Sequence, residues 1–170
     1  MTKSITILGM PGAGKSTIGR ELAAKRGLPF VDSDSEVEKA AHMSISQIFE
    51  KLGETAFREG ESKVISQLLA GPQRIISTGG GSFMHKATRE IIKKKAISIW
   101  LKVDFDILLE RVLRSKNRPL LNKEDPATVL RDLIEQREPV FAEANIIVEV
   151  AACNIHETVE KVERSLDNYL

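Results

Sequence analysis

The sequence lacks the features that mark several common classes of protein. It has one cysteine, Cys153, so neither a disulfide within the chain nor a cysteine-based zinc cluster can form. Its three histidines, His42, His85 and His156, are widely spaced and show no metal-ligand pattern, so we expect them on the surface or at helix ends. No apolar stretch approaches the ~18 residues that a membrane-spanning helix requires.

The net charge is also close to zero. Lys and Arg exceed Asp and Glu by a formal charge of +1, so no overall basic field favours nucleic acid or an acidic membrane surface. Any anion-binding site must therefore be local. The first residues carry no secretory signal pattern. We expect a cytoplasmic protein without nucleic-acid or membrane partners.

What is present is the composition of one globular domain of 170 residues, 42% apolar and 29% charged. Strand patterns alternate with helical ones from end to end, without repeats or linkers. We expect strands at 4–8, 30–31, 74–77, 96–101 and 146–150. Expected helices lie at 18–25, from about 34, 44–53, 54–70, 86–94, 105–114, 126–142 and from 155 onward. This alternation predicts an α/β three-layer sandwich, a five-stranded parallel sheet with helices on both faces.

The closing helix carries an apolar stripe along one side. Its members recur at helical spacing, and we assign all of them to the core rather than to a cofactor site. They are Ile155, Val159, Val162, Leu166 and Tyr169.

The most specific motif lies between the first strand and the first helix. Residues 9–17 read G-M-P-G-A-G-K-S-T, which matches the phosphate-binding loop G-x-x-x-x-G-K-[ST]. Its backbone N–H groups and the positive end of the helix attract phosphate. Lys15 can reach the outer phosphates, and the Ser16 hydroxyl can hold Mg²⁺. A chance glycine-rich turn would not predict these flanking elements. The expected nucleotide contacts here are Gly12, Ala13, Gly14, Lys15, Ser16 and Thr17.

Two aspartates follow the second strand, at the sheet edge where ligands bind in parallel sheets. In extended backbone, Asp32 and Asp34 share a face. One could approach the metal while the other accepts the proton of a substrate hydroxyl. The alternative is that one of them merely caps the following helix.

Three glycines, Gly79, Gly80 and Gly81, follow the third strand. Their backbone is uncovered by side chains, so its N–H groups could bond a substrate carboxylate or hydroxyl. The alternative is a flexible turn, which the entropy cost of three glycines makes the weaker account.

Three arginines are candidates for anion binding. The forks of Arg58 and Arg137 suit a carboxylate, although each also fits a surface charge, and Arg58 could pair with Glu61 three residues on. Arg118 lies in the polar, basic segment 115–125, which we expect to be a mobile lid over the transferring phosphate. A solvated run of charge is the alternative for that segment.

The ordered set of motifs resembles the shikimate kinase family over nearly the whole chain. The matching stretches are 9–17, 32–34, 57–61, 79–81 and 118–121. The resemblance implies a P-loop kinase fold, with residues 1–170 as a single domain. It also implies transfer of the γ-phosphoryl of ATP to the 3-hydroxyl of shikimate, with Mg²⁺ bound alongside ATP. The near-neutral charge and the lack of an obvious exposed apolar stripe favour a monomer.

The resemblance also implies roles on the acceptor side. Asp34, Arg58, Arg137 and the glycines 79–81 would hold shikimate, with the arginines clamping its carboxylate. Asp34 would also orient or deprotonate the attacking hydroxyl. The substrate-binding helices would span about 34–60, with Phe49 and Phe57 lining the pocket.

On the donor side, Lys15 and Arg118 would stabilise phosphoryl charge. Ser16, with Asp32 through water, would hold Mg²⁺, and Arg111 would stack on adenine.

Two departures from the family pattern concern Phe141, where the family usually has Tyr, and the loop 151–155, which lacks the basic and Pro residues often found near adenine. Two rival hypotheses are a gluconate or nucleoside monophosphate kinase, and a non-catalytic nucleotide-binding regulator. The first would not predict the whole motif set. The second predicts loss of Lys15, Asp34 or Arg58, and all three are present.

Overall fold

A computed structural model describes residues 2–115, 125–151 and 154–170. Its sheet has five strands, all parallel, in the order β2-β3-β1-β4-β5. The predicted five-stranded parallel sheet is therefore confirmed. The strands are β1 (Ser4–Leu8), β2 (Phe30–Asp32), β3 (Ile75–Ser77), β4 (Ala96–Val103) and β5 (Ile146–Val150).

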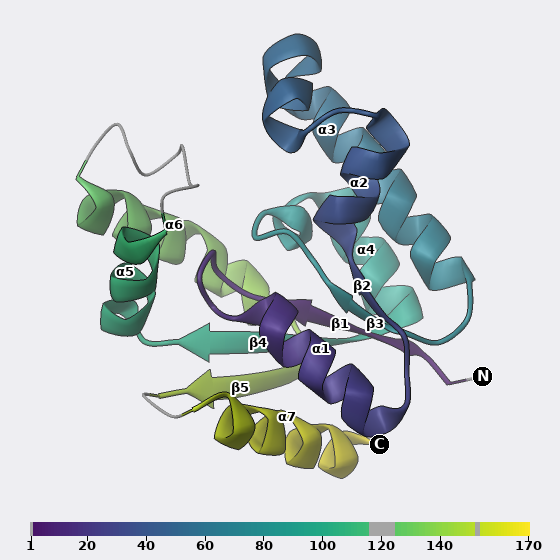
Figure 1. Cartoon of the computed structure of the whole chain (residues 1–170), viewed down its shortest axis with the longest axis vertical. Helices are drawn as coiled ribbons and strands as arrows, with labels where there is room; N and C mark the ends of the chain where they lie inside the picture. The colour runs from purple at the N-terminus through teal and green to yellow at the C-terminus, as the bar shows by residue number, and fades with distance from the viewer. Residues whose placement is uncertain (1, 116–124, 152–153) are drawn as a thin grey trace.

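Helices cover both faces of this sheet (Figure 1). Helices α1 and α7 lie side by side on one face, and α3, α4 and α6 lie on the other. Within the described ranges, no helix is both long and apolar enough to cross a membrane. The helices are α1 (Lys15–Arg26), α2 (Ser33–Ala41), α3 (Ile45–Ala70), α4 (Lys86–Lys95), α5 (Phe105–Arg114), α6 (Pro126–Phe141) and α7 (Ile155–Tyr169), and the short 3₁₀ helix η1 (Ser82–Met84) was not predicted.

Side chains of the central strands fill the two spaces between the layers. Trp100 of β4 packs against Phe141 of α6, with ring centroids 5.7 Å apart. The next residue, Leu101, pairs with Val148 of β5, which is buried on the α7 side. Because successive side chains of a strand point to opposite faces of the sheet, β4 contributes to the core on the α6 side and to the core on the α7 side. This arrangement confirms the predicted three-layer sandwich.

Local sequence signals explain the region that projects from the sheet at the top of Figure 1. The capping box of Ser44 and Gln47 starts α3, and Gly53, at φ 85°, kinks it. Gly53 itself lies outside the helical region, with φ 85° and ψ 171°, so α3 consists of two helical parts that meet at Gly53, as the sequence predicted. Both parts of α3 pack with α2 around a small separate hydrophobic cluster of Val37, Ile48, Phe57 and Val64.

The stripe of α7 was predicted wrongly at its two ends. Val159, Val162 and Leu166 are buried as expected, but Ile155 is 51% exposed and Tyr169 is 49% exposed. A 15-residue helix is about 22 Å long, whereas the five residues of β5 span about 17 Å. The ends of α7 therefore extend beyond the strand that it covers.

Candidate active site

The phosphate-binding loop joins β1 to α1, and glycines fix its shape. Gly12 and Gly14 have φ of 85° and 90°, in the left-handed region that glycine adopts at little cost. Helix α1 begins at Lys15, three residues before the predicted start at 18, with Gly14 as an N-cap that makes no side-chain hydrogen bond. The first N–H groups of α1 are therefore left for an anion.

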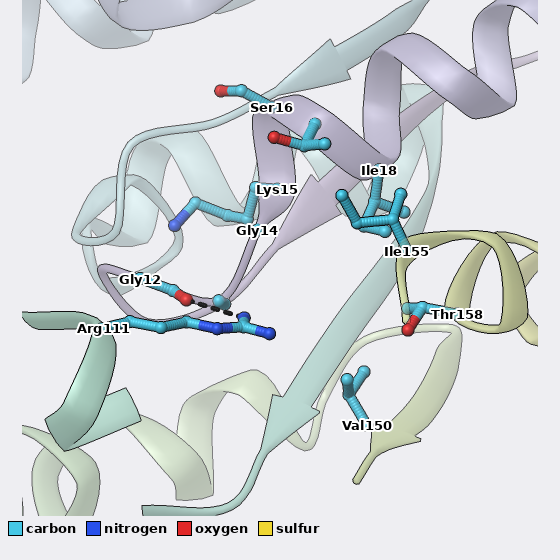
Figure 2. A pocket seen from close by; sticks show the side chains of 11 residues that line it. Gly12, Gly14, Lys15, Ser16, Ile18, Arg111, Val150, Ile155 and Thr158 are labelled. Atoms are coloured by element: carbon cyan, nitrogen blue, oxygen red, sulfur yellow. Dashed lines mark hydrogen bonds between the residues drawn. The ribbon is translucent and has the colours of Figure 1, made fainter. Parts of the chain in front are cut away.

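A cavity of about 490 Å³ opens at this loop (Figure 2). All six loop residues predicted to contact nucleotide line it, and so does Arg111, whose Nη1 donates to the Gly12 carbonyl at 3.0 Å. Predicted site residues from α1 and α5 are thus brought together.

Three further residues form the far wall of this cavity: Val150 at the end of β5, and Ile155 and Thr158 in the first turn of α7. Val150 and Thr158 were missed from the sequence, whereas Ile155 was placed both in the core stripe and at the end of the loop 151–155 near adenine. The assignment of Ile155 to the core was wrong, because its side chain faces the cavity (Figure 2). The missed signal was its place just beyond the carboxyl end of a strand, where parallel sheets bind ligands.

Hydrogen bonds within the protein hold the polar side chains of Lys15 and Ser16 in place. Lys15 Nζ donates to the carbonyls of Gly9 at 3.0 Å and Met10 at 2.9 Å. Ser16 Oγ donates to Asp32 Oδ2 at 2.9 Å and lies 3.2 Å from Ser77 Oγ. Ser77 was not predicted, although it ends β3 and pairs in register with Asp32.

Asp32 caps the following helix and also faces the phosphate loop, so the cap and the position proposed for metal binding are compatible. Its Oδ1 accepts from the N–H groups of Asp34 at 2.9 Å and Ser35 at 3.3 Å, which caps α2. Its Oδ2 faces Ser16 of the phosphate loop. The hydroxyl and carboxylate oxygens here are hard donors of the kind that Mg²⁺ prefers. This donor set fits a magnesium ion that takes its remaining ligands from water and phosphate.

The predicted geometry of Asp34 was wrong. The chain is not extended there, because capping by Asp32 turns it into α2, and Asp34 occupies the first turn of that helix. Burial, followed by the nearby charges of Glu61 and Asp32, raises the pKa of Asp34 to about 6, against the opposing effects of Lys15 and Arg58. Asp34 is thus a carboxyl group set to titrate near neutral pH.

Arg58 makes the ion pair with Glu61 that the sequence allowed. Its Nη1 donates to Glu61 Oε1 at 2.9 Å, and Ser82 donates to Glu61 Oε2 at 2.7 Å. The Glu61 side chain is completely buried, whereas that of Arg58 remains 20% exposed. A buried carboxylate with these two partners fixes the guanidinium rather than leaving it as a loose surface charge.

Arg137 of α6 lies in an unfavourable environment. Its Nη1 is buried and has no hydrogen-bond partner within residues 2–115, 125–151 and 154–170. Burial, and then the charge of Arg58, lowers the pKa of Arg137. Both arginines line one cavity of about 320 Å³ together with Gly81. Two guanidinium groups on one cavity, one with an unpaired donor, suit a carboxylate ligand.

The remaining predicted residues have mixed outcomes. Arg118 and most of the predicted lid at 115–125 lie outside the described residues. The rings of Phe49 and Phe57 are 4.8 Å apart, with Phe57 buried and Phe49 exposed. Phe141 is buried against Trp100, so the ring fills space in the core where the family pattern has Tyr.

The parallel sheet, the phosphate loop, the cavity shared by Arg58 and Arg137, and the Asp34 carboxyl beside Gly79 define a P-loop phosphotransferase that acts on small molecules. The family model described as Shikimate kinase matches residues 11–167. The chain therefore belongs to the shikimate kinase family and is an ATP-dependent kinase.

Individual relatives agree with this assignment. The chain is 46% identical to a shikimate kinase of Rhodopseudomonas palustris over 99% of its own length and 83% of the relative. It is 48% identical to that of Paramagnetospirillum magneticum over 99% and 86%. A solved shikimate kinase from Acinetobacter baumannii, in complex with shikimate, matches with a TM-score of 0.92 and 36% identity over 99% of this chain and 94% of that one.

The rival sugar-acid kinases share the fold. A gluconokinase from Sinorhizobium meliloti matches 98% of this chain and 95% of its own, with a TM-score of 0.64 at 18% identity. That likeness concerns the fold alone, so shikimate kinase is favoured over gluconate kinase.

Proposed function

We propose that this chain transfers the γ-phosphoryl of ATP to the 3-hydroxyl of shikimate, giving shikimate 3-phosphate and ADP. The observation that carries the proposal is the buried Nη1 of Arg137, which has no hydrogen-bond partner among the described residues, on a cavity shared with Arg58. Two arginine side chains on one small cavity suit the binding of a small molecule that carries a carboxylate. Asp34, whose pKa is close to 6, supplies an acceptor for the proton of a hydroxyl on the same molecule.

On the donor side, the phosphate loop holds the triphosphate through backbone N–H groups. Lys15 compensates the charge that develops on the transferring phosphoryl group. Arg111 flanks the base, and Arg118 would bring a second cation to the phosphoryl group. Ser16 and Asp32 would hold Mg²⁺, which neutralises phosphate charge when bound.

On the acceptor side, Arg58 and Arg137 clamp the carboxylate, and the backbone of Gly79–Gly81 lies against the substrate. Asp34 is mostly ionised above its pKa of about 6, so near pH 7 it accepts a hydrogen bond from the 3-hydroxyl and then takes its proton. Such proton transfer typically raises the rate by a factor of about 10²–10⁴. The clamp aligns the hydroxyl with the phosphate loop for in-line displacement.

A coupled assay for ADP release tests the proposal. We expect release that depends on shikimate, ATP and Mg²⁺, with gluconate and nucleoside monophosphates giving at most about a hundredth of the rate, as unpaired site groups penalise a poor substrate. No shikimate-dependent release would sink the proposed function. Faster turnover of gluconate would favour the sugar-acid kinase instead.

We also propose that residues 1–170 act as one domain and as a monomer in the cytoplasm, with the helices 34–60 and the lid 115–125 closing on bound substrates. The separate hydrophobic cluster shared by α2 and α3 supports movement of these helices as a unit. Hydrogen exchange should show added protection in both segments with ligands, and light scattering should give the mass of one chain. Unchanged protection or a dimer mass would contradict the respective point.

A further inference from the structure

The glycine triplet after β3 is not explained by backbone conformation. Among the described glycines, positive φ occurs at glycines 9, 12, 14, 27 and 53, and none of Gly79, Gly80 and Gly81 is in that group. Any residue could adopt the backbone of the triplet. The reason for three residues without side chains must therefore lie in what occupies the space around the triplet.

That space is taken by the acceptor-site side chains. A Cβ atom at Gly79 would lie 2.7 Å from Asp34 Oδ1 and 3.3 Å from its Oδ2. At Gly81 it would lie 3.0 Å from both Cζ and Nη1 of Arg58 and would collide with its Nη2. All the nearest contacts of a Cβ at Gly79 are with Asp34, and all those of a Cβ at Gly81 are with Arg58.

The middle glycine differs from its neighbours. A Cβ at Gly80 would lie 3.0 Å from Arg137 Nη1 and 3.2 Å from Cδ of Pro11 in the phosphate loop. A substitution at Gly80 would disturb both Arg137 on the acceptor side and Pro11 on the donor side. Its effect on activity therefore could not be assigned to one residue.

The atoms that a Cβ would meet at 79 and 81 are the ends of side chains, not backbone. Such a clash is relieved by moving the carboxylate or the guanidinium, so the fold does not have to change. We propose that Gly79 and Gly81 are positioning residues: the missing Cβ of Gly79 sets the place of the Asp34 carboxylate, and that of Gly81 sets the place of the Arg58 guanidinium. The inference rests on the proposed function, which gives proton acceptance to Asp34 and carboxylate binding to Arg58.

The two positions should then have separable kinetic effects. In Gly79→Ala we expect kcat to fall about 100-fold, the cost of a misplacement near 1 Å, while the KM for shikimate changes less than about threefold. In Gly81→Ala we expect the KM for shikimate to rise about tenfold with kcat nearly unchanged, because the clamp binds ground and transition state alike. The same loss of kcat in both variants would overturn the assignment.

Gly71 offers a matched control. A Cβ there would lie 2.7 Å from Nη2 of Arg74, which is again an arginine tip, and Arg74 belongs to neither half of the site. Gly71 has a φ of −86°, which alanine tolerates. Gly71→Ala should leave both kinetic constants unchanged, and all three variants should unfold within about 4 °C of the wild type.

A double-mutant cycle identifies the partner. If Gly81 acts through Arg58, then Gly81→Ala should lower kcat/KM for shikimate by less than about twofold in an Arg58→Ala background. Full additivity of the two effects would overturn the proposal.

Crystal structures of Gly79→Ala and Gly81→Ala give a readout that needs no turnover. Displacement of the Asp34 carboxylate in the first and of the Arg58 guanidinium in the second, with the rest of the site superimposing, supports the proposal. Unmoved groups overturn it. A wild type without shikimate turnover would refute the proposed function and leave this structural test to decide the positioning role.

Discussion

The donor and acceptor halves of the site are built in different ways. The donor half is largely one contiguous stretch, residues 9–17, and it presents mainly backbone groups. The acceptor half consists of side chains from α2, α3 and α6, set against the glycines before η1. One half is therefore encoded locally, whereas the other depends on how distant elements pack.

The two halves also differ in how well their charges are satisfied. Lys15 donates to two carbonyls, and Arg111 donates to a third. In the acceptor half, Arg137 Nη1 has no partner among the described residues, and the pKa of Asp34 is raised to about 6. The acceptor half thus contains two unfavourably placed charged groups. A ligand carboxylate would relieve Arg137, and a ligand hydroxyl would relieve Asp34. Such preorganisation for a ligand lowers the stability of the free protein.

The largest effect should come from the donor half. Lys15→Met removes the cation next to the transferring phosphoryl, and we expect kcat to fall by about 10³-fold or more. Calorimetry should show shikimate binding within about twofold of the wild type, because the acceptor half is intact. A kcat within tenfold of the wild type would show that the loop lysine is not the main source of charge stabilisation.

In the acceptor half, Asp34→Asn should lower kcat by about 10²–10³-fold, since the amide cannot take the proton. In the wild type, kcat should fall as pH drops through about 6, because the carboxyl becomes protonated there. The variant should lose this dependence in steady-state pH profiles. Asp106→Asn, at an exposed position on α5, is the control and should retain the wild-type profile.

Arg137→Ala should mainly weaken acceptor binding. Loss of a charge-assisted hydrogen bond of about 1.5–3 kcal/mol should raise the KM for shikimate roughly 10- to 100-fold, with the KM for ATP unchanged. Arg131→Ala on the same helix, where the guanidinium stacks over Phe105, is the matched control. Equal effects in both variants would remove the distinction between the two halves.

The smallest expected effect concerns stability. The folded-state pKa of Asp34 lies above its usual 3.8, so the folded protein binds more protons than the unfolded chain between about pH 4 and 6. The contribution of Asp34 to the free energy of unfolding therefore falls as pH rises through that window. Above about pH 6, the ionised carboxylate lowers the free energy of unfolding by nearly its full amount. Asp34→Asn should stabilise the protein by about 3 kcal/mol near pH 8 and have little effect near pH 4, measured by urea unfolding. A destabilised variant near pH 8 would show that the carboxylate is not under electrostatic strain.

The sequence predicted much of the fold because the signals were local. Alternating strand and helix patterns gave the parallel sheet, and Gly53 marked the kink in α3. The sequence allowed capping by Asp32 and predicted a helix from about residue 34, but the prediction that Asp32 and Asp34 share a face assumed extended backbone, which ends where α2 begins at Ser33. The bounds of α1 were also missed, since the phosphate loop ends directly in the helix at Lys15.

Within the site, the sequence by itself determined the phosphate loop, whose nine residues, 9–17, fix their own backbone and need only a strand before and a helix after them. Only the tertiary structure decided that Ser77 meets Ser16, that Ile155 faces the nucleotide cavity, and that Gly79 and Gly81 make room for Asp34 and Arg58. These contacts join residues far apart in the chain. No local pattern encodes them, because they arise from the order of the strands and the packing of helices across their ends.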